Sequence, residues 1–344
     1  MKVLVLTTMV PFVHGGAEEL CVNLVRQLRA HGAEAEAMAL PFTWEPAERL
    51  IEEMLIARSL RITNTDRVIA LKFPTWLVDH PNKTVWLLHQ YRQAYDLLDA
   101  GQSNIPATPR GEEILRAIQT ADASELSQVR HLYANSRVTA DRLWHYNGLV
   151  GTVLPPPLND PELFAAGPSQ GYILASGRVN TGKRQHLLLE ALALAPGVRL
   201  IVAGPPDTPE DAGRLQSLVS RLGIEDRVRL DLRFLPRAEL ARLVTGAQAV
   251  AYLPFDEDSP GYVTMEACQA RKPVVTVTDS GGVLDLVIDG VTGWVCAPDP
   301  EALAAALAEA SGGEQICVAR GAAGYDTLRR LNLSWSATID RLLA

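Results

Sequence analysis

Residues 2–30 read KVLVLTTMVPFVHGGAEELCVNLVRQLRA, and this stretch decides the fold class. Residues 3–6 form a short apolar run with the composition of a buried β-strand. An amphipathic pattern with helical spacing then extends over residues 17–30, and Gly32 is placed to end that helix. A strand, a loop and a helix in this order form the unit from which parallel sheets covered by helices are built.

The same alternation continues along the chain and predicts an α/β fold. The other runs that we interpret as strands are 36–40, 68–71, 84–88, 132–134, 172–175, 199–203, 228–230, 249–253 and 274–278. Three consecutive prolines, 155–157, interrupt the series, and proline cannot continue a sheet.

Because the alternation restarts after the prolines, we predict two Rossmann-like, doubly wound domains, 1–155 and 156–325. The final segment, 314–344, is predicted as helix. Its last part, 326–344, is a candidate to cross back to the first domain, which the sequence leaves open.

Composition excludes some classes of function. The 344 residues carry a formal charge of −8 with a pI near 5.5, which argues against nucleic acid as a partner, because phosphate backbones need a basic face. A small anionic ligand is not excluded, since a few placed Arg and Lys residues suffice for it. The four cysteines are scattered without a C-x-x-C pair, so we expect buried thiols in a reducing compartment, and neither a disulfide framework nor a zinc site.

The apolar run at the N-terminus is too short for a signal peptide and lacks a small-residue cleavage site. No stretch approaches the roughly 18 apolar residues of a membrane-spanning helix. We therefore expect a cytoplasmic protein without a transmembrane segment. Peripheral membrane contact and the oligomeric state are left open.

Two glycines, Gly15 and Gly16, stand where the loop after the first strand enters its helix. Open α/β sheets bind ligands outside the carboxyl ends of their strands. Glycine lets the backbone approach a ligand closely, and a helix N-terminus carries positive partial charge. The pair is a candidate contact for an anionic ligand, with a plain turn as the alternative; it is not the G-x-G-x-x-G pattern of NAD enzymes.

Two basic residues, Arg178 and Lys183, flank the strand-to-helix loop that follows the first strand of the second domain. Guanidinium offers a forked grip on a diphosphate, and ammonium offers a point charge. Solvated surface charge is the alternative, since loops with two basic residues are common.

The strongest candidate is the stretch DEDSPGYVTMEA, residues 256–267, which follows the apolar run 249–253. A helix is predicted to begin near Gly261. The free amides of Gly261, Tyr262 and Val263 would then point at an anion.

Two carboxylates of this stretch are assigned to different parts of a ligand. Glu266, just over one turn into the helix, could accept hydrogen bonds from a ribose diol, and Asp258, in the loop, could hold sugar hydroxyls. The alternative is a solvated acidic turn. The position between a buried strand and a glycine-started helix disfavours that interpretation.

Together these residues resemble family 4 of the glycosyltransferases, which retain the anomeric configuration and have the GT-B fold, two Rossmann-like domains facing each other across a cleft. The resemblance covers nearly the whole chain. It rests on Gly15-Gly16, Asn135-Ser136, the prolines 155–157, Arg178 with Lys183, the stretch 258–266, Gly281-Gly282 and the run DGVTG at 289–293.

The chain departs from the family at one point. The family pattern is Glu, seven residues, Glu, whereas spacing places Asp258 in the first position, with Glu266 in the second. Glu257 is a rival for the first position, and it would need a one-residue bulge before Gly261. We favour Asp258 on spacing.

His89 ends the apolar run 84–88, and from its position alone a structural and a functional role are equally supported. The resemblance implies that it lies against the donor sugar. It further implies a first domain on the acceptor side and a second that binds the donor.

The reaction implied by the resemblance is transfer of a sugar, with retention, from a nucleoside-diphosphate sugar to an acceptor hydroxyl. The acceptor is a glycan, a glycoconjugate or a small molecule, and neither metal nor another cofactor is expected. The residues expected in catalysis are His89, Asp258, Arg178 and Lys183. A GT-B epimerase or phosphorylase, and a non-catalytic sugar-nucleotide-binding protein, remain alternatives. The donor base, the sugar and the linkage are not specified.

Overall fold

In a computed structural model of the chain, residues 1–11 and 15–344 are described, and the chain divides into two compact units. Unit 1 comprises Met1–Pro157 together with Leu333–Ala344, and unit 2 comprises Leu158–Asn332. The first boundary lies two residues after the predicted one, at the end of the proline run. The return to unit 1 begins at Leu333 rather than at residue 326.

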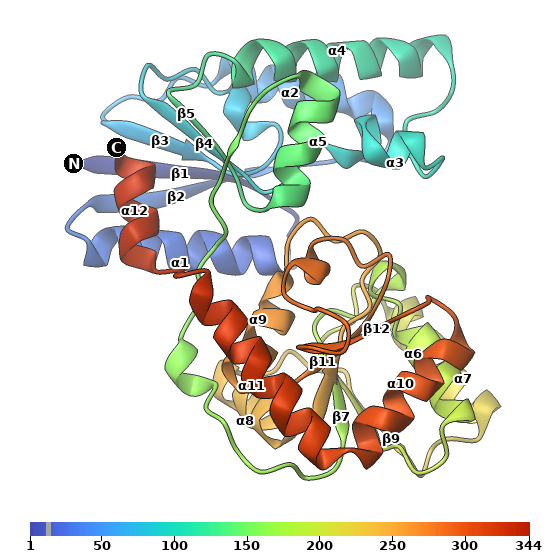
Figure 1. Cartoon of the computed structure of the whole chain (residues 1–344). Coiled ribbons are helices and arrows are strands. Elements are labelled where there is room, and N and C mark those ends of the chain that lie inside the picture. Colours follow the sequence, from blue (N-terminus) through green and yellow to red (C-terminus); the bar gives the residue numbers. More distant parts are fainter. Residues whose placement is uncertain (12–14) are drawn as a thin grey trace. The chain divides into compact units, whose positions relative to one another are not determined.

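Unit 1 is a parallel sheet with helices on both faces (Figure 1). The strand order is β2-β1-β3-β4-β5-β6. The strands are β1 (Lys2–Met9), β2 (Glu34–Pro41), β3 (Arg67–Ala70), β4 (Lys83–Leu87), β5 (His131–Ala134) and β6 (Thr152–Val153). The helices are α1 (Gly16–Ala30), α2 (Leu50–Ser59), α3 (Asp96–Asp99), α4 (Pro109–Leu126), α5 (Arg137–Asn147) and α12 (Trp335–Leu343), with 3-10 turns η1 (Ala47–Arg49), η2 (Thr75–Leu77) and η3 (Arg92–Ala94).

The sheet of unit 1 separates two apolar clusters. One lies under α2, α4 and α5 and includes Leu50, Trp76 and Ile114, all completely buried. The other lies under α1 and α12 and includes Leu24 and Trp86. Strands buried on both faces read as continuous apolar runs, which is why the sequence identifies them.

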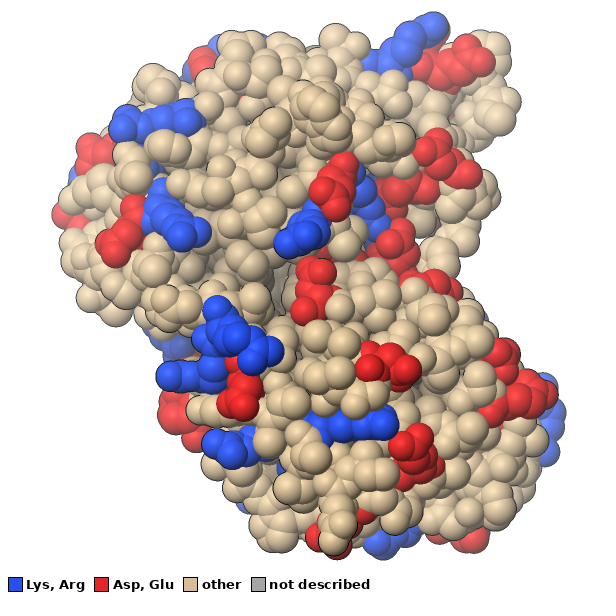
Figure 2. Space-filling model, in the orientation of Figure 1, with Lys and Arg blue, Asp and Glu red and all other residues tan. Residues whose placement is uncertain are grey.

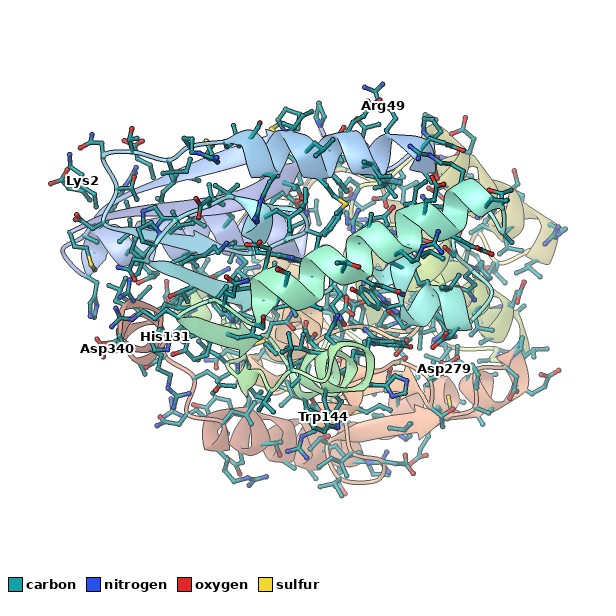
Figure 3. All side chains as sticks on the ribbon, turned by 90° about the horizontal axis from the view of Figure 1, so that it is seen from above. Lys2, Arg49, His131, Trp144, Asp279 and Asp340 are labelled. Atoms are coloured by element: carbon teal, nitrogen blue, oxygen red, sulfur yellow. The ribbon has the colours of Figure 1, made fainter. Side chains whose placement is uncertain are left out.

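Helix α12 packs on unit 1. Ile339 and Leu342 are completely buried in the α1 cluster, and the Tyr133 hydroxyl of β5 donates to the Arg341 carbonyl over 2.9 Å. Asp340 of this helix, labelled in Figure 3, lies 3.0 Å from Nε2 of His31, the residue after α1. The predicted final helix is in fact two, α11 (Glu314–Arg330) and α12, and Asn332 takes a φ of +48° in the break between them.

Unit 2 is a second parallel sheet between helices (Figure 1). Its strands are β7 (Ile173–Ser176), β8 (Leu200–Ala203), β9 (Val228–Asp231), β10 (Ala249–Ala251), β11 (Val274–Val277) and β12 (Gly293–Cys296). Its helices are α6 (Gln185–Leu194), α7 (Pro209–Leu222), α8 (Arg237–Gly246), α9 (Gly261–Gln269), α10 (Pro300–Gly312) and α11, with 3-10 turns η4 (Pro161–Leu163), η5 (Thr181–Lys183) and η6 (Gly282–Asp285).

The strand order of unit 2 is β12-β11-β10-β7-β8-β9. Counted from β7, this is the 3-2-1-4-5-6 order of dinucleotide-binding folds. Strands β7 and β10 are neighbours, with Ala249 opposite Ile173, and the order reverses between them. Connections leave this point in opposite directions, so the loops after β7 and β10 diverge and leave room for a ligand.

Gly204, which follows β8, is held against the loop after β7. It has a φ of +144°, and a Cβ built there would lie 2.1 Å from the Gly177 carbonyl oxygen. We expect Gly204→Ala to destabilise the fold by about 2–3 kcal/mol, because both backbone strain and a backbone clash result. Gly213→Ala in α7 is the matched control. It meets nothing within 4 Å and should stabilise the helix by roughly 0.5–1 kcal/mol in thermal unfolding. Equal melting temperatures for the two variants would contradict this.

In the part of the chain that the structure describes, no helix combines the length and apolar character needed to span a bilayer. On the face shown in Figure 2, acidic and basic side chains of the described residues are interspersed.

Candidate functional site

The loop that follows β7 carries the first candidate group of unit 2. Gly177 has a φ of +111°, and its amide continues the sheet by donating to the Ala203 carbonyl over 3.0 Å. Asn180 then caps the turn η5, because its side-chain oxygen accepts from the Lys183 amide over 2.9 Å. The cap fixes the backbone at Lys183, and with it the point from which the lysine side chain extends.

Lys183 contacts two groups that come from beyond β10. Its Nζ donates to the Tyr252 hydroxyl over 3.0 Å and forms an ion pair with Glu257. The ammonium also lies 5.2 Å from the centre of the Tyr252 ring. The neighbouring positions of β7 and β10 therefore bring together residues 69 and 74 positions apart in sequence.

Electrostatics keep Lys183 charged. Burial acts to lower the pKa of Lys183, but the adjacent Tyr252 and Glu257 outweigh burial and raise it. Burial raises the pKa of Tyr252 to about 12, with the Glu257 charge adding to the effect, so the hydroxyl stays protonated at neutral pH. The site thus presents a permanent cation with only one fifth of its side chain exposed.

Arg184 fastens the β7 and β10 loops to each other. Its guanidinium forks onto Asp279 after β11, at 2.9 and 2.7 Å, and also donates to the carbonyls of Leu253 and Pro254. Forked guanidinium–carboxylate pairs fix orientation as well as distance. The sequence prediction did not include Arg184; its position next to Lys183 was the only signal for it.

Gly281 and Gly282 pack against the backbone of the loop that carries Glu257 and Asp258. The Gly282 amide donates to the Glu257 carbonyl over 2.8 Å, and a Cβ on Gly281 would lie 2.4 Å from that carbonyl oxygen. Only glycine permits this approach, since Gly281 also has a φ of +61°. The loop that carries Glu257 and Asp258 is therefore a fixed part of the fold.

Helix α9 begins at Gly261, as the sequence predicts. Gly261 has a φ of +74°, and a Cβ there would lie 3.1 Å from the Tyr252 ring, so this turn packs directly on the tyrosine that binds Lys183. The residue before it, Pro260, has no side chain able to cap the helix. The first backbone amides of α9, including those of Tyr262 and Val263, therefore lie beside Tyr252 and the lysine that it binds.

Glu266 lies deeper than the sequence indicates. The residue is 2% exposed and forms an ion pair with Arg237 at the start of α8. Arg237 also donates to the Asn159 carbonyl over 2.9 Å and lies 4.6 Å from the centre of the Phe164 ring. Glu266 is therefore part of a buried connection between α9, α8 and the first residues of unit 2.

Arg178 and Lys183 each pair with a different carboxylate. Arg178 Nη1 alone donates to both carboxylate oxygens of Asp207, at 3.1 and 3.0 Å, and Asn180 donates to the same carboxylate over 2.8 Å. Asp207 follows β8 and was not among the predicted residues. Asp258 is half-buried in the loop between Glu257 and α9.

In unit 1, Gly15 immediately precedes α1 and Gly16 is its first residue. The Gly15 amide donates to the Glu18 side chain over 2.9 Å, and Glu18 pairs with Lys72 after β3 at 3.1 Å. Burial acts to raise the pKa of Glu18, yet Lys72 outweighs it and lowers that pKa. A carboxylate of the chain thus occupies this helix start. The rest of the loop, residues 12–14, lies outside the described residues.

His89 is half-buried just beyond the carboxyl end of β4. Its Nδ1 lies 2.7 Å from the Gln90 carbonyl oxygen. A carbonyl only accepts, so Nδ1 carries the proton, and in the neutral ring Nε2 is the acceptor. That tautomer can receive a proton or a hydrogen bond from a hydroxyl.

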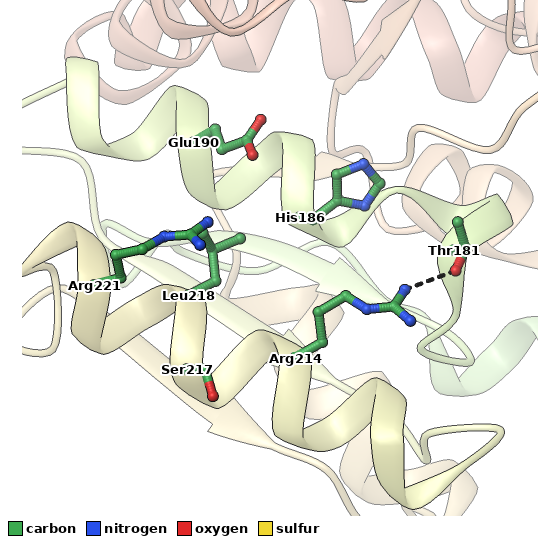
Figure 4. A pocket seen from close by; sticks show the side chains of 7 residues that line it. All are labelled: Thr181, His186, Glu190, Arg214, Ser217, Leu218 and Arg221. Atoms are coloured by element: carbon green, nitrogen blue, oxygen red, sulfur yellow. Dashed lines mark hydrogen bonds between the residues drawn. The ribbon is translucent and has the colours of Figure 1, made fainter.

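A cavity of about 350 Å³ lies between α6 and α7 of unit 2, beside the loop after β7 that carries Lys183 (Figure 4). Thr181 is the residue it shares with that loop, and Arg214 donates to the Thr181 hydroxyl over 2.8 Å. Its other lining residues are His186, Glu190, Ser217, Leu218 and Arg221. None of the predicted site residues lines this cavity.

Most of unit 2, including the groups around Lys183, is similar in sequence to a known protein family. Residues 161–326 match the family model described as glycosyl transferases group 1. Unit 2 therefore carries a group 1 glycosyltransferase domain. The match contains Arg178, Lys183 and the stretch from Glu257 to Glu266.

Among curated relatives, this chain is similar to two proteins named D-inositol 3-phosphate glycosyltransferase. The one from Mycolicibacterium gilvum is 34% identical over 185 residues, which are 51% of this chain and 39% of that protein. The one from Mycolicibacterium smegmatis is 29% identical over 279 residues, 75% of this chain and 62% of that protein. The chain thus spans less than two thirds of the length of either relative.

Solved structures share the fold of the whole chain. Anabaena HepE in complex with UDP has a TM-score of 0.74 at 20% identity, covering 100% of this chain and 98% of that one. Sucrose-phosphate synthase from Thermosynechococcus elongatus has a TM-score of 0.75 at 17% identity, covering 99% and 97%. The predicted class of two Rossmann-like units in the GT-B fold is confirmed.

Proposed function

We propose that the chain is a retaining glycosyltransferase that moves a sugar from a nucleoside-diphosphate sugar to an acceptor hydroxyl. The observation that carries the proposal is the position of Lys183 at the point where the strand order of unit 2 reverses. A permanent, partly buried cation there, beside the start of α9, suits a diphosphate. The glycosyltransferase domain match and the names of the curated relatives support the same reaction class.

The chemical role of these groups follows from where charge develops. As the glycosidic bond breaks, negative charge gathers on the leaving diphosphate. Lys183 and the amides of Gly261, Tyr262 and Val263 would stabilise this charge with little reorganisation, since the loops that hold them are fastened to one another. Arg178 would join them by leaving Asp207 for the ligand.

The ion pair between Lys183 and Glu257 makes a donor-dependent exchange part of the proposal. A diphosphate beside Glu257 would be repelled while that carboxylate stays on the lysine. We therefore infer that the donor replaces Glu257 on Lys183, and that Glu257 turns to a hydroxyl of the sugar. An ionised carboxylate accepts hydrogen bonds only, which suits it to hydroxyl groups.

The remaining residues are assigned to the sugar, the ribose and the backbone contacts. Asp258 is proposed to hold sugar hydroxyls, and His89, through Nε2, to contact the transferred sugar. Glu266 is proposed to bind the ribose, and Gly15 and Gly16 to contact the donor through their backbone. Retention is proposed to follow front-face attack, in which a donor phosphate oxygen takes the acceptor's proton.

The donor is tested by thermal shift against a panel of UDP-, GDP-, ADP- and dTDP-sugars. A ligand at a hundred times its dissociation constant stabilises the fold by about 2.7 kcal/mol. UDP-sugars come first, because the similar HepE binds UDP. Inositol phosphates and simple polyols then serve as acceptor candidates, given the names of the relatives. Stabilisation without turnover or slow donor hydrolysis would favour a non-catalytic binding protein.

Two conservative variants are expected to separate the acidic residues. Glu257→Gln should tighten binding of the free nucleoside diphosphate by roughly threefold to tenfold, because a charge that competes for Lys183 is removed. Asp258→Asn should leave that affinity unchanged and lower turnover. Calorimetric titration and donor hydrolysis measure both. Unchanged diphosphate affinity in Glu257→Gln would contradict the exchange, and full turnover in Asp258→Asn would contradict the sugar role.

Turnover is expected to be independent of divalent metal. The leaving diphosphate is assigned to a lysine, an arginine and a helix start, which together supply the positive charge. Activity should persist after exhaustive chelation. Loss of activity that magnesium or manganese restores would overturn this expectation.

A further inference from the structure

A fully buried carboxylate in unit 1 is balanced by neutral donors alone. Asp122 of α4 is 0% exposed and accepts from Trp76 Nε1 over 2.8 Å and from the Tyr95 hydroxyl over 2.9 Å. Among the described residues, no Lys, Arg or His forms an ion pair with it. Buried charges are ordinarily paired, so such a group is retained at a cost to stability.

A chain of side chains leads from this carboxylate to the residue after His89. The Tyr95 hydroxyl, which donates to Asp122, accepts from Asn147 Nδ2 at 3.4 Å. Asn147 Oδ1 in turn accepts from Gln90 Nε2. Gln90 is 3% exposed, and its backbone carbonyl oxygen accepts the hydrogen bond from His89 Nδ1. Four elements or loops of unit 1 thus meet along one line of hydrogen bonds.

The donor and acceptor inventory gives this line a single direction. An ionised Asp122 only accepts, so the one Tyr95 proton points to it. The tyrosine oxygen then accepts from Asn147, which must present its amide nitrogen to Tyr95 and its oxygen to Gln90. A protonated Asp122 could donate instead and allow every group in the line to reverse, including the Gln90 amide.

We propose that Asp122, in its ionised form, is a positioning residue for His89 and Gln90, acting through Tyr95 and Asn147. The direction of the hydrogen bonds fixes the Gln90 side chain, and the Gln90 carbonyl fixes the His89 ring. The consequence for turnover rests on the proposed role of His89 toward the donor sugar.

The charged and titratable groups around Asp122 set the pH at which it loses its charge and the line of hydrogen bonds can reverse. Among the described residues, Tyr95 is the titratable group that is hydrogen-bonded to Asp122. Lys83 donates to the Trp76 carbonyl and pairs with Glu125, which also pairs with Arg58. Tyr146, bonded to Asp99, packs on the Tyr95 ring.

Burial raises the pKa of Asp122 to about 7, and the hydrogen bonds from Trp76 and Tyr95 act to lower it. Because the ionised form is the positioning form, turnover of the donor should fall as the pH falls through about 7.

The test compares three variants by kcat and KM for hydrolysis of the donor found in the panel, across about pH 6 to 9. Asp122→Asn and Tyr95→Phe break the line and should lower kcat by about tenfold or more at high pH with KM nearly unchanged, and should abolish the acidic limb. Trp76→Phe is the control, because it removes a bond to Asp122 outside the line. It should keep the high-pH rate and move the limb to higher pH, since a bond that lowers the pKa of Asp122 is lost.

A second measurement does not depend on activity. In nuclear magnetic resonance spectra, the Gln90 side-chain amide should shift with pH near 7 in the wild type and not in Tyr95→Phe, which also serves if Asp122→Asn does not fold. If the wild type turns over no donor, the proposed function fails and this titration alone decides the inference. An unresponsive Gln90 amide overturns it. So does a wild-type kcat and pH profile in Tyr95→Phe, or an equal loss of kcat in Trp76→Phe.

Discussion

Replacing Lys183 with Met is expected to weaken binding of a free nucleoside diphosphate by about 1.5–3 kcal/mol, which is roughly 10- to 150-fold. The ammonium is held at the reversal point by Tyr252 and Glu257, and no second lysine contacts either group among the described residues. Turnover should fall at least as far as affinity, because charge on the diphosphate grows as the glycosidic bond breaks. Calorimetric titration with the diphosphate, followed by donor hydrolysis, measures both.

Lys272→Met provides the matched control for this prediction. Lys272 is a buried lysine of unit 2, and its Nζ donates to the Gly167 carbonyl over 2.7 Å rather than to Tyr252 or Glu257. It should lose stability and keep diphosphate affinity. Arg178→Ala should fall between the two, at most about 1.5 kcal/mol, since Arg178 must leave Asp207 to reach a ligand. Equal affinities in Lys183→Met and Lys272→Met would overturn the assignment.

The strands were predictable wherever both faces of the sheet are covered. Every residue of β3, β4 and β11 is buried, so each reads as a continuous run. The two strands missing from the prediction, β6 and β12, lie at sheet edges; β6 has two residues and is exposed along its length, and β12 is only partly buried in its second half. The break before α12 was missed because residues 331–334 contain neither Gly nor Pro.

The charged groups of the site were identifiable from the sequence, whereas their pairing was not. Position at a strand end selects Lys183, Glu257 and Arg178, because loops at those ends meet along one edge. Which carboxylate reaches which cation depends on strand order: β7 neighbours β10 and β8, and these bring Glu257 to Lys183 and Asp207 to Arg178. Strand order comes from the packing of the whole unit, and no local pattern encodes it.

Glu266 shows the same limit for depth. Its spacing from Gly261 places it correctly in the second turn of α9. That spacing carries no information about Arg237, 29 positions earlier, which draws the carboxylate into the interior. The sequence therefore predicts a side chain facing a ligand, and the structure adds that the same side chain supports the fold.

Glu266→Gln is accordingly expected to change both stability and binding. The loss of stability should be about 2–3 kcal/mol, because Arg237 would keep its charge in a mostly buried position with a neutral partner. For a unit of this size that corresponds to roughly 5–10 °C in melting temperature. If the carboxylate also binds the ribose, every nucleotide should bind more weakly well below that temperature, whether or not it carries a sugar.

Glu239→Gln on α8 separates a buried pair from an exposed one in the same unit. Glu239 pairs with Arg233 at 2.9 Å, but the arginine side chain is 61% exposed, so the change should cost less than about 1 kcal/mol. Differential scanning calorimetry of both variants measures the loss of stability. Titration with a nucleoside monophosphate, about 15–20 °C below the lower melting temperature so that the fold stays populated, measures the loss of binding. Together they distinguish a role of Glu266 in the fold from a role in binding the ribose. A large loss of stability with unchanged nucleotide affinity would make Glu266 a structural residue only. Wild-type stability in Glu266→Gln would mean that the buried pair with Arg237 contributes nothing to the fold.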